Sequence, residues 1–544
     1  MTPKVDGALV AALYCVALVV RLVPLTFSPL PYNVDGFALA RIMDGFGETG
    51  RWVSDEANVN RDDLKLPAFS LVGHAVVQMG GLHPLTDLQW FLPILLASVV
   101  LPIYLIAVKV TGNRVAGFAA GLFLALFGSF LFLTSAIMKE SLALLFVPTI
   151  ALTFHGRADP RKRAIAFVLL VVLVFLHHVT TLVAAAVVGS LIVLEHRRAG
   201  SRGRFSVRRL AADVGSGLTP FLIAWLYYRA VDLPNVDRVS ASIEEMVLFV
   251  AIAVVLTALV ARTWRPRPVL RRRRLLSPVH ASVLVPAVAV GAVLVNARET
   301  VFPATFTTQP ALLDLLPAVL VLAGFALVGY QVLRTTSSRS SDVVMALLVA
   351  PAVFLLFGFL RGLDVFSFRI TYRGFDFLDF GFAVLAGIGL AYVARRLGRR
   401  PATTVPLMAG FLGLLLATTP MAWDTQAVFG VDNVNRPEEF QTLSVLASLG
   451  ATGVASDQRV AHMGLWWYGF EVDPFLGTEL RDREPVRRSE YAIVLERWTT
   501  IGAQDFPRPN AILDRQTVED FLDAQWILYV TGTEGDRIYV ARLT

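Results

Sequence analysis

Charged residues are scarce in this chain of 544 residues, at 17% against 55% hydrophobic residues. Soluble globular proteins carry about 25% charged residues, so the deficit argues against a soluble protein. The apolar residues gather in many runs of about 20, the length that crosses a bilayer as a helix. Because the bilayer core has no water to satisfy backbone groups, these runs must be helical. The composition therefore predicts a polytopic helical membrane protein.

Other absences narrow the function. Cys15 is the single cysteine, so no disulfide can form within the chain. There is no Walker A loop, no dinucleotide-binding glycine fingerprint and no convincing Ser-His-Asp set, which argues against a nucleotide-driven cytoplasmic enzyme. The net charge of +7 does not indicate nucleic-acid binding, because the arginines cluster in short loops between apolar runs. We expect membrane lipids as partners instead, with the basic block at 262–274 against anionic headgroups.

The apolar runs predict about 13 membrane spans. We place them at 7–23, 91–110, 114–134, 138–154, 163–177, 180–195, 211–229, 246–263, 279–296, 312–333, 342–360, 374–394 and 402–420. A shorter apolar run at 66–79 is expected to form a re-entrant or interfacial helix. The first run is long and has no small-residue cleavage site, which favours an uncleaved anchor over a secretory signal peptide.

Basic loops set the orientation. The loops at 155–163 and 394–400 are strongly basic and are expected to face the cytoplasm. The N-terminus is then cytoplasmic, and an odd number of spans puts the C-terminus outside the cell (plasma) membrane.

The composition changes near residue 421, where mixed polar sequence replaces the apolar runs. We expect a transmembrane domain at 1–420, with a long first external loop at 26–65, and an extracytoplasmic domain at 421–544. Residues 526–530 and 537–543 alternate around a turn, which predicts a β-hairpin. The predicted fold is an all-α polytopic bundle with a small α/β C-terminal domain.

Three outer segments carry the candidate chemistry. Asp35 precedes an amphipathic stretch in the first external loop, where a carboxylate is either a helix cap or a general base. Lys139 and Glu140 enter an otherwise apolar helix, either as interfacial residues that snorkel or as a functional pair. Arg369 and Arg373 share a face if their segment is helical. Arg373 can pair locally with Asp376, or the two guanidinium groups can clamp a phosphate.

His177 and His178 lie at a tight outer turn. No cysteine or third histidine is near in sequence, so hydrogen bonding at the turn or to a substrate headgroup is favoured over zinc binding.

Together these features resemble the GT-C superfamily of membrane glycosyltransferases, above all the archaeal and eukaryotic oligosaccharyltransferase catalytic subunit, and also the dolichyl-phosphate-sugar-dependent transferases. Asp35, with Arg41 six residues later, resembles the first acidic element of the family, and Glu140 takes the place of the second. The family places an arginine against the donor phosphate, and Arg373 is the best match, with Arg369 second. The resemblance thus implies Asp35 and Glu140 as catalytic residues.

The outer loops carry the rest of the resemblance. Glu299 is the candidate counterpart of a family glutamate in a substrate-gating loop. Trp466 and Trp467 lie in a Leu-Trp-Trp-Tyr-Gly sequence that resembles the Trp-Trp-Asp-Tyr-Gly motif, which reads the acceptor Ser or Thr, but the aspartate is missing. Lys139 stands where a metal-binding acid would be expected. Both departures favour a metal-independent relative with a monosaccharide donor.

The resemblance implies an inverting glycosyltransferase of hexosyl or mannosyl type. It would move a sugar from a polyprenyl (dolichyl) phosphate donor to a lipid-linked glycan or surface glycoprotein. No residue is assigned to a metal, and a divalent cation, Mg²⁺ or Mn²⁺, is the one cofactor left open. The candidate substrate-binding residues are Arg41, Lys139, His178, Glu299, Trp466 and Trp467.

Three alternatives stay open. One is transfer of a whole glycan to protein, as an oligosaccharyltransferase does. Another is a flippase or transporter of a lipid-linked saccharide, although transporters usually show internal repeats and ionisable groups near mid-bilayer. The third is a non-catalytic surface scaffold whose outer domain binds a partner.

Overall fold

The structure is a computed structural model that describes residues 7–543 except 53–60, 202, 232, 234–242, 264–289, 292, 302–306, 336–339, 363, 399–400, 487–488 and 507. Two predicted segments therefore lie largely outside the described residues: the span at 279–296 and the basic block at 262–274.

The first half of the chain is helical throughout the described ranges. Its elements are α1 (Gly7–Arg21), η1 (Val23–Thr26), α2 (Asp35–Thr49), α3 (Arg61–Leu64), α4 (Ala68–Gly80), α5 (Pro84–Ala97), α6 (Val100–Thr111), α7 (Arg114–Leu126), α8 (Gly128–Ser135), α9 (Lys139–His155), α10 (Pro160–Leu176), α11 (His178–Gly200), α12 (Val207–Ala230) and α14 (Ile243–Thr263). The predicted short helix at 66–79 is α4, which packs on α2, where His74 Nδ1 lies 3.0 Å from the carbonyl oxygen of Met43.

The membrane part continues with long helices and ends in two short ones. These are α16 (Pro310–Thr335), α17 (Ser341–Arg361), α18 (Val365–Arg396), α19 (Pro401–Ala417), α20 (Pro420–Trp423) and α21 (Thr425–Phe429). A helix lies over each predicted span whose residues are described. The loop before α18 is shorter than expected, because Asp364 caps the helix by accepting from the backbone N–H of Ser367 at 2.6 Å. Arg369 and Arg373 thus lie within the first turns of α18.

Eight helices in the described part are long and apolar enough to cross a membrane, or up to nine if the bent α7–α8 pair is one span. Helices α9 and α10 have 17 residues each and fall just short of this length. The described residues therefore confirm a polytopic helical bundle, and the count of about 13 spans stays a prediction.

One predicted span is broken. The run at 114–134 forms α7 and α8, which meet at Phe127 with a bend of 64°. Gly128 starts the second helix, and its backbone N–H donates to Thr418 Oγ1 at 3.0 Å. A side chain at Gly128 would overlap the Thr418 carbonyl, so this close approach requires glycine. Hydropathy alone does not reveal such a break.

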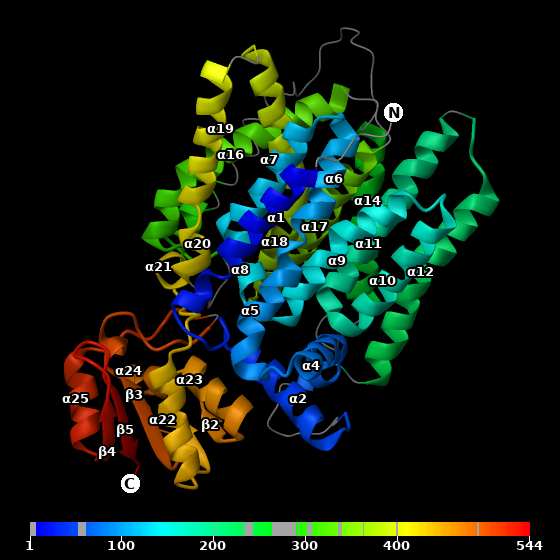
Figure 1. The fold of residues 1–544 in the computed structure, drawn as a ribbon. Helices are drawn as coiled ribbons and strands as arrows, with labels where there is room; N and C mark the ends of the chain where they lie inside the picture. The colour runs from blue at the N-terminus through cyan, green and yellow to red at the C-terminus, as the bar shows by residue number, and fades with distance from the viewer. Residues whose placement is uncertain are drawn as a thin grey trace.

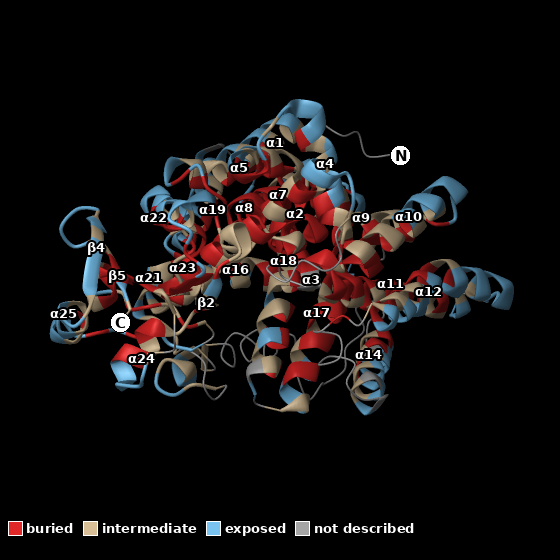
Figure 2. Ribbon diagram, turned by 90° about the horizontal axis from the view of Figure 1, so that it is seen from below, coloured by how far each residue is buried: buried red, intermediate tan, exposed pale blue. Residues whose placement is uncertain are grey.

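The core of the bundle is formed by α7, α11, α17 and α18, whose side chains are mostly buried, and Figure 2 shows buried residues in red at the centre of the bundle. Helix α12 at the side is mostly exposed, as expected for a helix that faces lipid. Helix α18 crosses the centre and packs against α7, α16 and α17. Helix α18 is therefore held in place by several helices.

The C-terminal part has a mixed five-stranded sheet in the order β2-β1-β3-β5-β4. Its elements are α22 (Pro437–Ser448), β1 (Gly453–Ala455), α23 (Gln458–Met463), the π-helical turn η2 (Gly464–Tyr468), β2 (Glu471–Asp473), α24 (Leu476–Asp482), β3 (Tyr491–Leu495), η3 (Glu496–Thr499), α25 (Arg515–Asp523), β4 (Trp526–Thr531) and β5 (Ile538–Arg542). Strands β4 and β5 pair antiparallel, which confirms the predicted hairpin.

Figure 1 shows the C-terminal unit at one end of the helical bundle, with α2 and α4 at that same end. The two meet directly, because Trp466 of η2 packs against Ala38 and Ile42 of α2. The segment that carries Asp35 thus lies between the membrane helices and the C-terminal unit.

Candidate active site

Asp35 is the first residue of α2, and a tight turn places it there. Asn33 has a φ of 91°, an unusual left-handed value that asparagine tolerates better than most residues. Its side-chain Oδ1 accepts from the backbone N–H of Asp35 at 2.9 Å. The cap position of α2 is Val34, which makes no side-chain cap bond, so Asp35 is the first helical residue rather than the cap. The capping interpretation of Asp35 loses its main support.

Gly36 brings α2 close to the segment that precedes α9. A Cβ at Gly36 would overlap Pro31 and lie 3.1 Å from the Cβ of Ile137. The backbone N–H of Ile137 donates to the Tyr32 carbonyl at 3.0 Å across the same contact. The absence of a side chain at Gly36 therefore lets Asp35 approach Lys139 and Glu140.

We expect Gly36→Ala to disturb this contact, because overpacking typically costs about 1–3 kcal/mol. The thermal unfolding midpoint in detergent should fall. Gly189→Ala is a matched control in α11, where a Cβ has open space, and should leave the midpoint unchanged or raise it slightly. Equal behaviour of the two variants would contradict the close contact.

Two ion pairs bring distant segments together beside Asp35. Lys139 Nζ lies 2.5 Å from Asp63 Oδ1, and the Asp63 side chain is only 4% exposed. Arg373 of α18 pairs with Glu140, which is also buried. The predicted residues Lys139, Glu140 and Arg373 thus meet, although 233 residues separate the last two.

Burial and the neighbouring charges both shift the pKa of the Asp35 carboxyl group. Burial and, to a smaller extent, the neighbouring Asp63 carboxylate raise the pKa of Asp35 to about 6, against the opposing cations of Lys139 and Arg373. These interactions show that Asp35 lies within electrostatic reach of both ion pairs. A carboxyl with a pKa near 6 is ionised at pH 7 yet basic enough to accept a proton, as a general base requires.

The turn that carries His177 and His178 lies near Lys139. His177 caps α11 by accepting from the backbone N–H of Thr180 at 3.3 Å. Both imidazoles are buried, and both feel the charge of Lys139. The Nδ1 atom of His178 has no hydrogen-bond partner among the described residues. His178 therefore has a buried ring nitrogen without a partner in the described part, within electrostatic reach of Lys139.

Two carboxyl groups follow Arg373 along α18. Asp376 is close enough to Arg373 for their charges to interact, as the local-pair interpretation expected, but within the described part its Oδ2 has no hydrogen-bond partner. Asp379, one turn deeper, accepts from Ser129 of α8 at 3.1 Å. Arg373 therefore lies between Glu140 on α9 and acidic groups on its own helix.

Three predicted residues lie apart from this cluster. Arg41 pairs with Asp44 at 3.2 Å, and six residues along a helix turn it roughly 120° away from Asp35. Arg369 is exposed one turn before Arg373. Glu299 is also exposed, and in the described ranges no contact links it to Asp35 or Arg373. The structure does not bring Arg41, Arg369 or Glu299 together with the acidic residues.

Trp466 and Trp467 lie at the junction of the C-terminal unit and α2. Trp466 stacks on His462 with 4.6 Å between ring centroids and packs against α2. The Trp467 ring lies 6.3 Å from both His83 and Phe440. Both indoles are only half-buried, so each packs against the junction and still presents some surface to solvent.

Asp63 and Asn33 were not singled out from the sequence. Asp63 belongs to an acidic pair just before an apolar helix in the first external loop. A carboxylate just before an apolar helix was the sequence feature that could have indicated Asp63 as a site residue. Asn33 had none, because its role depends on a backbone angle and on contacts with residues far along the chain.

The carboxylates do not fit a divalent metal ion. Lys139 already neutralises Asp63, and Arg373 neutralises Glu140. In the described part of the chain, no group of three or more His, Cys, Asp or Glu side chains is arranged to hold a metal. A cation would have to displace two protein cations from buried carboxylates.

Comparison with solved structures identifies the fold. The chain is 13% identical to the Archaeoglobus fulgidus oligosaccharyltransferase in complex with Zn and sulfate, with a TM-score of 0.51, over 90% of this chain and 68% of that one. The same protein tethered to an acceptor peptide with the NVT sequon is 14% identical, with a TM-score of 0.51, over 99% and 74%. The chain has the GT-C fold. This confirms the predicted fold class.

A second GT-C protein is similar at lower score. Cupriavidus metallidurans ArnT bound to undecaprenyl phosphate is 13% identical over 99% of each chain, with a TM-score of 0.44. No family model and no curated protein matches the sequence.

Proposed function

We propose that this GT-C chain is an inverting glycosyltransferase. It moves a single sugar from a polyprenyl-phosphate donor to a lipid-linked glycan or surface glycoprotein on the outer face of the cell membrane. The meeting of Asp35, Glu140 and Arg373 at one end of the bundle carries the proposal. The fold supports it, because the similar Archaeoglobus protein is a glycan transferase whose structure holds an acceptor peptide.

Asp35 is the proposed general base. Its carboxylate removes the proton from an acceptor hydroxyl while that oxygen attacks the anomeric carbon. The bond between the anomeric carbon and the phosphate oxygen breaks, and the polyprenyl phosphate leaves with the electron pair. One proton is transferred to Asp35, one bond forms and one breaks, and the configuration at the anomeric carbon inverts.

Arg373 is the proposed partner of the leaving phosphate. A guanidinium group binds phosphate in a bidentate manner and stabilises the negative charge that develops as the bond breaks. Glu140 orients Arg373 through their ion pair, and its Oε1 has no hydrogen-bond partner among the described residues. This oxygen is available to an acceptor hydroxyl. Lys139 and His178 are the other polar side chains proposed to lie beside the phosphate.

The orientation follows from this chemistry together with the loops. The site lies at the end of the bundle that carries the C-terminal unit, while the basic loops that follow α9 and α18 leave the membrane on the cytoplasmic side by the positive-inside rule. We propose a cytoplasmic N-terminus and an extracytoplasmic C-terminal domain. A protease added outside intact cells should then cut within residues 421–544 and spare the loops at 155–163 and 394–400.

Transfer of a whole glycan is the second candidate. Trp466 of the C-terminal unit packs against α2, so an acceptor peptide bound at this tryptophan would lie near Asp35. However, the motif lacks the aspartate that would accept a hydrogen bond from the acceptor hydroxyl. We therefore propose a monosaccharide donor. A flippase for a lipid-linked saccharide is less compatible with this site. A flippase needs no general base, whereas the proposed site has a carboxylate for that role beside a guanidinium group that binds phosphate.

The pH dependence follows from the raised pKa of Asp35. Only the ionised carboxylate accepts a proton, so kcat/KM should fall about tenfold per pH unit below pH 6. Asp63→Asn removes a neighbouring charge that raises the pKa of Asp35. The acidic limb of the pH profile should therefore move to lower pH in this variant. A limb that stays in place or moves upward would contradict the assigned electrostatics.

The test of the proposed function is a donor screen with purified protein. Dolichyl-phosphate mannose and dolichyl-phosphate glucose are offered with a glycolipid acceptor, with and without EDTA. We expect one donor to yield sugar on the acceptor and free dolichyl phosphate, at an equal rate with EDTA. No turnover of either donor would contradict a monosaccharide transferase, and loss of turnover in EDTA would contradict metal independence.

A further inference from the structure

A short segment of the C-terminal unit touches the loop that carries Asp35. The backbone N–H of Asn33 donates to the carbonyl of Asn433 at 3.0 Å, and Asn33 Nδ2 donates to Asn433 Oδ1 at 2.9 Å. Asn435 is buried, and its Nδ2 donates to the carbonyl of Pro31 at 2.7 Å. These bonds join residues that lie 400 or more positions apart in the chain. Residues 31–33 are thus bound side by side with residues 433–435.

The opposite side of the same loop is held by the membrane bundle. The backbone N–H of Tyr32 donates to Gln89 Oε1 at 2.7 Å, and its carbonyl accepts from Ile137 at 3.0 Å. The Tyr32 hydroxyl donates to the Ala422 carbonyl at 2.7 Å. The loop therefore lies in a two-sided clamp. Because Asn33 Oδ1 also accepts from the backbone N–H of Asp35, the position of the loop sets the position of the carboxylate.

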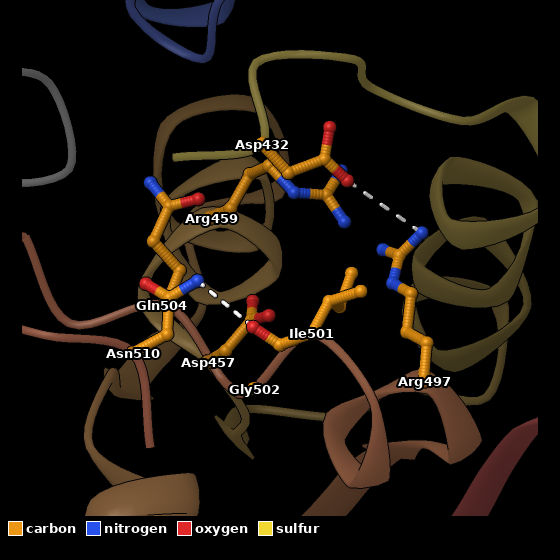
Figure 3. Close-up of a pocket in the computed structure, with 8 residues that line it drawn as sticks. All are labelled: Asp432, Asp457, Arg459, Arg497, Ile501, Gly502, Gln504 and Asn510. Atoms are coloured by element: carbon orange, nitrogen blue, oxygen red, sulfur yellow. Dashed lines mark hydrogen bonds and ion pairs between the residues drawn. The ribbon is translucent and has the colours of Figure 1, made fainter. Parts of the chain in front are cut away.

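Buried charges anchor the segment on the C-terminal side. Arg459 donates to the Val434 carbonyl at 2.8 Å and pairs with Glu439 at 2.5 Å. Arg497 pairs with the same glutamate and faces Asp432 at 3.8 Å, as the dashed line in Figure 3 shows. Removing one partner of a buried ion pair is strongly destabilising. Residues 432 and 434 are therefore tied to the buried charges of the C-terminal unit.

We propose that Asn433 and Asn435 are positioning residues that hold the Asp35 loop against the membrane bundle, so that the C-terminal unit sets the geometry of the base. The inference rests on the proposed function of Asp35. Both asparagines act on the base through their bonds to Asn33 and Pro31. A displacement of about 1 Å in a catalytic group can cost on the order of 100-fold in rate.

The test compares two asparagines that each donate to a backbone carbonyl. Asn435→Ala removes the bond to Pro31, whereas Asn510→Ala removes a bond to the Ile501 carbonyl elsewhere in the same unit. Hydrogen exchange at the backbone amides of residues 33–37 is measured first, because it does not depend on activity. Transfer kinetics are then measured on the same preparations.

We expect Asn435→Ala to speed exchange at residues 33–37 and to lower kcat roughly 10- to 100-fold, with the donor KM nearly unchanged. Asn510→Ala should alter neither. Unchanged exchange in Asn435→Ala would overturn the clamp, and faster exchange with normal kcat would overturn its role in positioning. If the wild type transfers no sugar, the proposed function fails while the exchange result still decides the clamp. Should Asn435→Ala not fold, Asn33→Gly, which tolerates the positive φ angle, tests the same loop.

Discussion

Asp35→Asn should lower the rate of sugar transfer by roughly 10²- to 10⁴-fold, because an amide cannot accept the proton that the acceptor hydroxyl releases. The substitution is nearly isosteric, and the Asp35 side chain is not the N-cap of α2, whose cap position is Val34. Folding and donor binding should therefore stay close to those of the wild type. The measurement is transfer by purified protein, with the amount of folded protein checked by gel filtration and thermal unfolding.

Asp44→Asn is the matched control for that prediction. Asp44 lies on the same helix, and its pair with Arg41 is about one-third exposed, at 32% and 31%. Exposed pairs contribute at most about 1 kcal/mol, so this variant should keep nearly the full rate. A folded Asp35→Asn protein that transfers sugar as fast as Asp44→Asn would remove Asp35 from the mechanism.

Loss of Arg373 should have the second large effect. Arg373→Ala leaves Glu140 buried without a partner, so the variant is made together with Glu140→Gln to avoid a lone buried charge. The double variant should lose roughly 10²- to 10³-fold in kcat, the typical cost of one group that stabilises developing negative charge. Transfer kinetics with saturating donor measure this loss.

Two comparisons make the result specific. Glu140→Gln alone keeps the guanidinium and should lose less than the double variant. Arg369→Ala removes an exposed arginine one turn earlier on α18 and should also lose less. If Arg369→Ala matches the double variant, the phosphate lies at Arg369 and the assignment to Arg373 is wrong.

The sequence was sufficient for the helical fold and for selecting three residues that lie close together in the structure. Apolar runs locate helices because the bilayer leaves the backbone no other way to satisfy its hydrogen bonds. Asp35, Glu140 and Arg373 could be selected because ionisable side chains at the ends of apolar helices are costly unless they have partners. Their meeting in the structure agrees with this selection, and their roles stay proposals.

Other features depended on tertiary contacts that no local pattern encodes. Asp63 pairs with Lys139 from a distant loop, and the bend at Phe127 reflects the close approach of Thr418 to Gly128. Arg41 was chosen from its spacing to Asp35, but the helical geometry of α2 turns it away. The contacts of Asn433 with Asn33 join opposite ends of the chain.

The most direct measurement uses proteoliposomes that contain the purified protein, a labelled polyprenyl-phosphate sugar and an acceptor outside the vesicles. Transfer of label to the acceptor and movement of the donor across the bilayer are followed in the same sample. We expect label on the acceptor and free polyprenyl phosphate with the wild type, and neither with Asp35→Asn. Donor that crosses the bilayer with no label on any acceptor would contradict an enzyme and indicate a transporter.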